Sequence, residues 1–221
     1  MGILAIQYRM LEDAPILVAF NREEQIARQF SAPRIQSGRP RVVCGIDRKT
    51  GGTWAGVNQH GMFVAAINAP KRRMPFEPRS RGLLCKELLA CHTAAEAVEY
   101  AERELLTDSY AGVNYLCVDR TAGFVVYGGL EFGVEALQPG LHILTGNRMD
   151  DREDERQEYV RRLLTLHRLD SSVAFLAATS GAFSRAPDAS GLRGVVVQEP
   201  GFGTVCSMLL SLSDRSQKSI M

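Results

Sequence analysis

Short apolar runs separated by turn residues fill the first third of the chain and predict strands. Residues 2–9 alternate between apolar and polar side chains, and Leu11–Pro15 has the composition of a turn, so an opening hairpin is expected. The polar tetrapeptide Asn58–Gly61 ends in glycine between two apolar runs, which is typical of a second hairpin loop. The strands predicted in this part of the chain are 2–9, 16–20, 42–46, 53–57 and 62–67.

Helical patterns begin in the middle of the chain. Leucines recur at helical spacing after Ser80-Arg81-Gly82, and Thr93–Glu96 matches a capping box that opens a helix ending near Leu106. Residues 151–168 are acidic first and basic last, as the helix dipole prefers, and a further short helix is predicted over 173–178. Strands are predicted again at 113–118, 124–127, 141–145, 195–197 and 204–212.

The order of these elements predicts the fold class. Strands, a helix pair, strands, helices and strands follow one another, which favours a layered α+β domain with mostly antiparallel sheets over a parallel doubly wound sheet. A length of 221 residues suits one domain over residues 1–221. The sequence has neither GxGxxG nor GxxxxGK[ST], so nothing in it indicates a nucleotide phosphate cradle.

Composition and charge argue against nucleic acid and membranes as binding partners. There are 26 basic and 25 acidic residues, a formal net charge of +1, which argues against a dedicated nucleic-acid binder. The basic clusters Arg39–Arg41 and Lys71–Arg73 lie in proline-bearing stretches and predict solvated loops. The uncharged stretch Ala14–Phe20 is far shorter than a membrane span, and the start does not match a secretory signal. We therefore expect a cytoplasmic protein without membrane insertion.

The cysteines and histidines do not form a metal-binding pattern. The five cysteines are an odd number without a CxxC pair, which predicts buried free thiols. The four histidines are scattered, so no metal is expected. His60 falls in the predicted 58–61 loop, where such a residue most often simply closes the turn.

Three phrases in a fixed order resemble one family. Asn21-Arg22-Glu23-Glu24 follows the second predicted strand, Gly51–Gly56 reads GGTWAG, and Gly203-Thr204 opens the last strand. Together they resemble the NRDE family, the family of the transport and Golgi organisation protein 2. Ser80–Leu83 and His142–Thr145 also look like segments of that family, so the resemblance covers nearly the whole chain.

A second, more distant resemblance implies chemistry. The segment Gly56–Met62, followed by Asn68-Ala69-Pro70, is similar to part of the penicillin V acylase and bile-salt hydrolase group. Those enzymes are N-terminal-nucleophile hydrolases with a four-layer αββα sandwich, which agrees with the element order. The resemblance implies that Asn68 helps to build an oxyanion hole, which would stabilise a tetrahedral intermediate.

The resemblance fails at the nucleophile. The family usually begins Met-Cys, whereas this chain begins Met1-Gly2, and glycine has no side chain to attack a carbonyl. Glu23 also replaces the family aspartate, Asn147 stands one place later than the matching asparagine, and Val205 replaces a frequent arginine. The resemblance implies a pocket around Gly2, Asn21, Arg22 and Asn68. The candidate site residues are Gly2 (the vacant nucleophile position), Asn21, Arg22, Glu23, Asn68 and Asn147.

Two classes of function remain open. In the first, the chain handles a small hydrophobic or amide-containing ligand, such as haem or a lipid, without covalent chemistry. His60 is then a candidate axial ligand for haem, and no cofactor is otherwise expected. In the second, the chain is an amidohydrolase acting on linear, non-peptide C–N bonds whose native nucleophile is a cysteine at position 2. For Arg22 and the two glutamates after it, the alternative to a pocket is the first turn of a helix.

Overall fold

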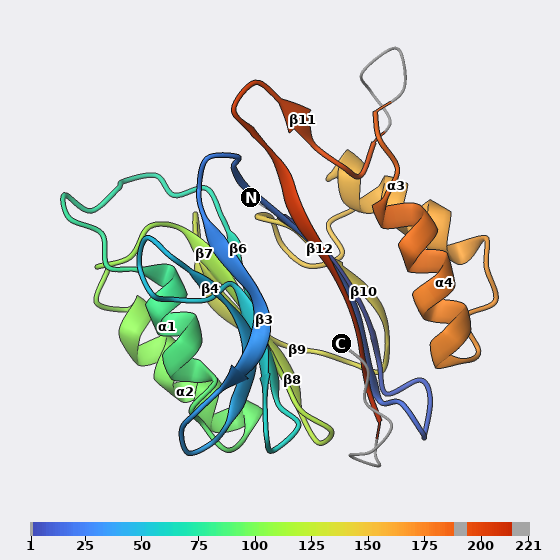
Figure 1. Cartoon of the computed structure of the whole chain (residues 1–221), viewed down its shortest axis with the longest axis horizontal. Coiled ribbons are helices and arrows are strands. Elements are labelled where there is room, and N and C mark those ends of the chain that lie inside the picture. Colours follow the sequence, from blue (N-terminus) through green and yellow to red (C-terminus); the bar gives the residue numbers. More distant parts are fainter. Residues whose placement is uncertain (1, 188–193, 214–221) are drawn as a thin grey trace. The chain divides into compact units, whose positions relative to one another are not determined.

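The computed structural model describes residues 2–187 and 194–213, and the chain forms two compact units (Figure 1). Unit 1 combines the two ends of the chain, up to Ala27 and from Pro139 onward, and unit 2 is the continuous stretch Arg28–Gln138. Each unit contains one antiparallel sheet and one pair of helices. Among the described residues, no helix is both long and apolar enough to cross a bilayer.

Unit 1 contains a five-stranded sheet with the order β10-β1-β2-β12-β11. Its strands are β1 (Gly2–Tyr8), β2 (Ile16–Gln25), β10 (Gly140–Leu144), β11 (Gln198–Glu199) and β12 (Phe202–Leu212). The predicted opening hairpin is confirmed, because β1 and β2 pair antiparallel with Gly2 opposite Arg22. β1 lies between β10 and β2, and all of its residues are buried.

Helices α3 (Glu155–Thr165) and α4 (Ser172–Phe183) pack on one face of this sheet (Figure 1). Alternate residues of β1 and β2 point to that face, as the pleat of a strand requires. The core between the sheet and the helices includes Ile3, Ala5, Ala19, Val160, Leu164 and Phe183.

Unit 2 contains a seven-stranded sheet whose strands follow the chain order from β3 to β9. The strands are β3 (Phe30–Gln36), β4 (Val42–Asp47), β5 (Ala55–Asn58), β6 (Phe63–Asn68), β7 (Val113–Val118), β8 (Gly123–Gly128) and β9 (Phe132–Ala136). Helices α1 (Arg81–Leu88) and α2 (Ala94–Leu105) pack on one face of it. Their shared core includes Met62, Val64, Leu84, Leu88, Ala97 and Tyr115.

The differences from the predicted elements have physical reasons. β3 and β9 were not expected, because they are edge strands whose side chains are mostly exposed or half-buried and so lack an apolar run. The strand predicted at 195–197 is wrong, because these residues are outside any strand and the short strand β11 begins only at Gln198. The alternative of a helix start at Arg22–Glu24 is also wrong: β2 continues to Gln25 because β12 pairs with it up to that residue.

Candidate functional site

Three residues lie in a row across three strands of unit 1, and the first of them is Gly2, the position of the missing nucleophile. Gly2 on β1 lies opposite Arg22 on β2, and Arg22 lies opposite Cys206 on β12. Directly opposed residues of antiparallel strands share a face of the sheet, so these three residues lie on the same face. The strand β12 reaches this register through a bulge between Thr204 and Cys206. The row therefore brings a thiol to the same face as Gly2, with an arginine between them.

The space beside Gly2 is already filled. A Cβ placed on Gly2 would lie 2.9 Å from Cε2 of Phe20 and 2.9 Å from the carbonyl oxygen of Asn21. Both distances are shorter than carbon and oxygen atoms tolerate without a shift of their neighbours. A side chain of any size at position 2 would have to displace the Phe20 ring or the β2 backbone. In its present form this sheet is therefore built around glycine at position 2.

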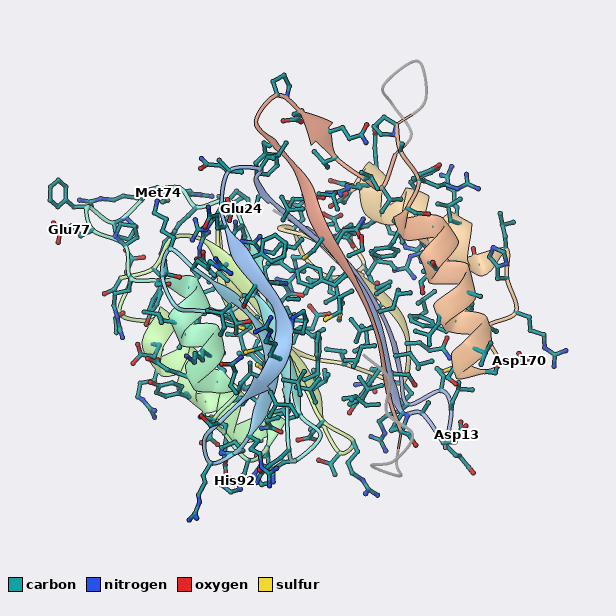
Figure 2. All side chains as sticks on the ribbon, in the orientation of Figure 1. Asp13, Glu24, Met74, Glu77, His92 and Asp170 are labelled. Atoms are coloured by element: carbon teal, nitrogen blue, oxygen red, sulfur yellow. The ribbon has the colours of Figure 1, made fainter. Side chains whose placement is uncertain are left out.

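Arg22 is the charged residue of the row. Its side chain is only 8% exposed and forms an ion pair with Glu24 at 3.4 Å, between Nη2 and Oε2 (Figure 2 shows Glu24). Burial raises the pKa of the Cys206 thiol, and the nearby Arg22 charge lowers it only in part. Cys206 is therefore a thiol at neutral pH, a weak nucleophile. The row suits the binding of a carbonyl or carboxylate by Arg22 better than attack on it.

Asn21 and Glu23 point to the opposite, helix-covered face. The Asn21 amide donates from Nδ2 to the carbonyl oxygen of Phe183 at the end of α4, at 2.9 Å. Glu23 is buried and forms an ion pair with Arg156 of α3. Both contacts hold the helices onto the sheet. The expectation that Asn21 lines one cavity with Gly2 and Arg22 is not supported, because neighbouring residues of a strand point to opposite faces.

Asn147 belongs to the cap of α3. Its Nδ2 donates to Oδ2 of Asp154 at 3.0 Å, and Thr145 donates to the same oxygen at 2.6 Å. Through its other carboxylate oxygen, Asp154 accepts from the main-chain N–H groups of Arg156 and Gln157 at the first turn of α3. This arrangement gives Asn147 a local structural role, and any part in a reaction stays a prediction.

Unit 2 brings two of the family-like phrases together. The main-chain N–H of Thr53 donates to the carbonyl oxygen of Gly82 at 2.9 Å, and a Cβ on Gly52 would lie 2.3 Å from the carbonyl carbon of Gly82. The GGTWAG phrase and the Ser80–Leu83 phrase therefore meet at the first turn of α1, where Ser80 caps the helix. This close approach requires glycine at position 52, whereas a Cβ on Gly82 would lie 3.1 Å from the Thr53 carbonyl oxygen and need only a small shift.

Asn68 stands at the end of β6, opposite Val113 of β7. It is half-buried, and within the described part of the chain its side-chain amide has no hydrogen bond to a protein group. Gly2 and Asn68 belong to different units, so a shared pocket of the two stays a prediction.

His60 is exposed in the turn between β5 and β6, as the sequence predicted. Its ring stacks on that of His92, with centroids 4.4 Å apart and planes at 26°. The Asn58–Gly61 hairpin loop is confirmed, and Asn58 accepts from the main-chain N–H of His60 through Oδ1 at 3.0 Å.

The fold places the chain among mixed α+β proteins with the N-terminal-nucleophile hydrolase fold. A Caenorhabditis elegans N-acylethanolamine-hydrolyzing acid amidase ortholog is similar in structure, with a TM-score of 0.57 and 12% identity over 85% of this chain and 87% of that one. Penicillin V acylase from Agrobacterium tumefaciens has a TM-score of 0.49 and 11% identity, over 96% of this chain and 83% of that one. A search of curated sequences finds no match.

The family follows from the sequence itself. The family model described as Transport and Golgi organisation 2 matches residues 1–218. The chain therefore belongs to the Transport and Golgi organisation 2 family, as the NRDE-like phrases indicated.

Two residues of the Gly2 site were missed by sequence reasoning. Phe20 occupies the space of a side chain at position 2, and Cys206 supplies the thiol of the row. The pattern could have flagged Phe20, because it is a large ring on the strand paired with the glycine. No signal in the sequence could have flagged Cys206, since the bulge in β12 sets its register.

Proposed function

We propose that this chain binds a small hydrophobic or amide-containing ligand in the cytoplasm without forming a covalent intermediate. One observation carries the proposal: the space of a position-2 side chain is occupied by Phe20 and the Asn21 carbonyl. An acyl intermediate needs a nucleophile there, and Gly2 supplies none. Arg22 and the Asn68 amide are donors suited to a ligand carbonyl or carboxylate.

The similarity to an N-acylethanolamine-hydrolyzing amidase ortholog suggests fatty-acid amides as the first ligands to test. Lipids fit the proposal better than haem. His60, the candidate haem ligand, stacks flat on His92 beside arginines rather than in an apolar pocket.

The test combines binding and turnover. The purified protein is titrated with an N-acylethanolamine while binding is followed by calorimetry and products by mass spectrometry. We expect reversible, saturable binding without hydrolysis and without an acyl adduct on the protein. Arg22→Gln and Asn68→Ala should each weaken binding about tenfold, the value of one charge-assisted or buried hydrogen bond. Arg34→Gln, at an exposed position of β3, is the matched control and should leave binding unchanged.

The competing function is hydrolysis of non-peptide amides. It would be established if the protein as it stands turned over the amide and Asn68→Ala abolished that activity. A double variant, Gly2→Cys with Phe20→Ala, gives the hydrolase hypothesis its fairest trial. It supplies the thiol and removes the Phe20 ring, one of the two groups that a Cβ at position 2 would meet; the Asn21 carbonyl oxygen remains. Covalent acylation at residue 2 in this variant alone would show that the rest of the site still supports the chemistry.

A further inference from the structure

A hollow within unit 2 brings together the side-chain hydrogen-bond donors of two arginines and two histidines. It has a volume of about 430 Å³ and is lined by Arg39, Arg41, Gln59, His60 and His92, among others. This volume lies in the range of small-molecule pockets. Among the described residues that line it, none carries a carboxylate. The two guanidinium groups and the two imidazole rings form no hydrogen bond or ion pair with a protein side chain in the described part of the chain.

The segments that carry these side chains are tied to one another. Gln59 accepts from the main-chain N–H of Arg41 through Oε1 at 3.0 Å, and the Gln59 N–H donates to the Arg41 carbonyl at 2.8 Å. These two bonds attach the stretch before β4 to the β5–β6 turn. The side chains of Arg39 and Arg41 are therefore presented beside His60.

The buried side chain of Asn58 ties together the two segments that carry His60 and His92. It is only 4% exposed, and its Oδ1 accepts from the main-chain N–H of His60. Its Nδ2 donates to the carbonyl oxygens of Leu89 at 3.1 Å and Cys91 at 2.8 Å. One buried amide thus fixes the turn that carries His60 against the segment that carries His92, which Figure 2 labels. These hydrogen bonds hold the segments of the two stacked rings together, which lowers the cost of ordering them on binding.

We propose that this hollow binds a phosphate group carried by a small molecule or a lipid headgroup. Arginine forks and imidazole N–H groups both donate to phosphate oxygens, and charge-assisted bonds of this kind are among the strongest in proteins. A phosphate dianion has three terminal oxygens, which matches four donor side chains better than the two oxygens of a carboxylate do. The proposal does not depend on the ligand of the Gly2 site, since it rests on unit 2 alone.

The first experiment uses inorganic pyrophosphate as the probe. The ring Cε1–H signals of His60 and His92 are assigned with His60→Gln and His92→Gln and followed by NMR at low salt. Both signals should shift saturably, and Arg39→Gln/Arg41→Gln should raise the dissociation constant about tenfold or more. Arg39→Lys/Arg41→Lys, which keeps the charge, should recover part of the affinity.

The matched control is Arg34→Gln/Arg48→Gln, which removes two exposed positive charges from the same unit outside this lining. It should change the dissociation constant by less than about twofold, because separated surface charges act weakly. An equal loss of affinity in the control would reduce the effect to general charge attraction and overturn the proposal. If the ring signals do not shift with pyrophosphate, the proposal that the hollow binds the phosphate of a soluble small molecule is overturned.

A second arm distinguishes the source of the phosphate. The protein is sedimented with phosphatidylcholine vesicles that contain phosphatidic acid, and with phosphatidylcholine alone. Retention on the phosphatidic acid vesicles that is lost in Arg39→Gln/Arg41→Gln and kept in the control identifies a headgroup. If neither pyrophosphate nor these vesicles engage the two histidines, no phosphate site exists here.

Discussion

Glycine at position 2 is the residue on which the proposal of non-covalent ligand binding rests. Its neighbours Phe20 and Asn21 occupy the space of any side chain there, so a new side chain would also require its neighbours to move. A cysteine at this position would meet a filled space as well as a changed set of partners. The residue and its surroundings therefore offer no room for a side chain at position 2 without a shift of β2 or Phe20.

We expect Gly2→Ala to lower the free energy of unfolding by about 1–3 kcal/mol, since the new methyl group overpacks a buried strand. Chemical denaturation followed by circular dichroism measures this loss. Gly133→Ala on β9 is the control, because a Cβ there meets nothing within 4 Å. It should be neutral or slightly stabilising, since alanine loses less backbone entropy than glycine. Equal effects of the two substitutions would contradict the filled space at Gly2.

Asp47, at the end of β4, anchors the turn that leads to the GGTWAG phrase. Its carboxylate accepts from Arg28 Nη2 at 2.5 Å, from the Thr50 hydroxyl at 2.7 Å and from the Lys49 main chain at 3.1 Å. Burial raises the Asp47 pKa, but these hydrogen bonds outweigh burial and lower it to about 2. The charged carboxylate therefore stabilises the folded state.

Because the folded-state pKa of Asp47 lies below its unfolded value, its contribution is complete above about pH 4 and lost as the pH falls towards 2. The contribution amounts to about 2 kcal/mol. Asp47→Asn should remove it, so the stability of the variant and of the parent should converge between pH 5 and pH 2. Asp13→Asn, at an exposed position (Figure 2), is the control and should follow the parent at every pH. A constant difference between Asp47→Asn and the parent would refute this assignment.

At the scale of elements, side chains at helix starts decide where the helices begin. Thr93 accepts from the Glu96 N–H at 3.2 Å, which confirms the predicted cap, although the Glu96 carboxylate reaches the N–H of His92 rather than that of Thr93. Asp154 plays a larger part, because one carboxylate caps α3 and also binds Thr145 and Asn147. This cap joins β10 to α3.

Asp154→Ala should therefore cost about 1–2 kcal/mol of stability, the usual loss for an N-cap. Asn147→Ala should cost less, because its hydrogen bond to Asp154 lies at an exposed position. The control is Asp170→Ala, whose side chain is 56% exposed and pairs with Arg168 at the surface (Figure 2 labels Asp170). Its effect should stay below about 0.5 kcal/mol. Thermal unfolding of the three variants ranks them, and a large effect of Asn147→Ala would point to a role beyond the cap.

At the scale of the whole molecule, the five cysteines are free, as their spacing predicted, but the predicted burial is wrong for Cys91 and Cys206, which are half-buried. Cys44, Cys85 and Cys117 are buried in unit 2, and burial raises the pKa of each thiol. Cys206 of unit 1 is only half-buried. The thiols therefore report on the two units separately.

A thiol reagent should modify Cys206 faster than the three buried cysteines of unit 2 in the native protein. Modification of Cys44, Cys85 and Cys117 requires opening of the core, so its rate should rise steeply with denaturant. Mass spectrometry of digested samples assigns each site. Rapid modification of the three in the absence of denaturant would contradict the burial of this core. If they react at the same denaturant concentration as unfolding of unit 1, the two units unfold together.

Much of the local structure could be predicted from the chain alone. The two hairpins at Gly2–Gln25 and Ala55–Asn68, the cap at Thr93 and the family could all be inferred, because turns, caps and phrases depend on neighbouring residues. The cap at Ser80 was not predicted. The edge strands β3 and β9 could not, because they have little buried surface to leave a pattern.

The candidate sites depended on the tertiary structure. Sequence alone indicated that position 2 lacks a nucleophile and that Asn68 is a candidate donor. Register and pleat decided that Arg22 shares a face with Gly2 while Asn21 binds α4 on the other, and packing decided that Phe20 fills the space beside Gly2. The hollow of unit 2 is built from three segments that only folding brings together. Such contacts between distant residues leave no trace in local patterns, because they depend on strand pairing across the sheet.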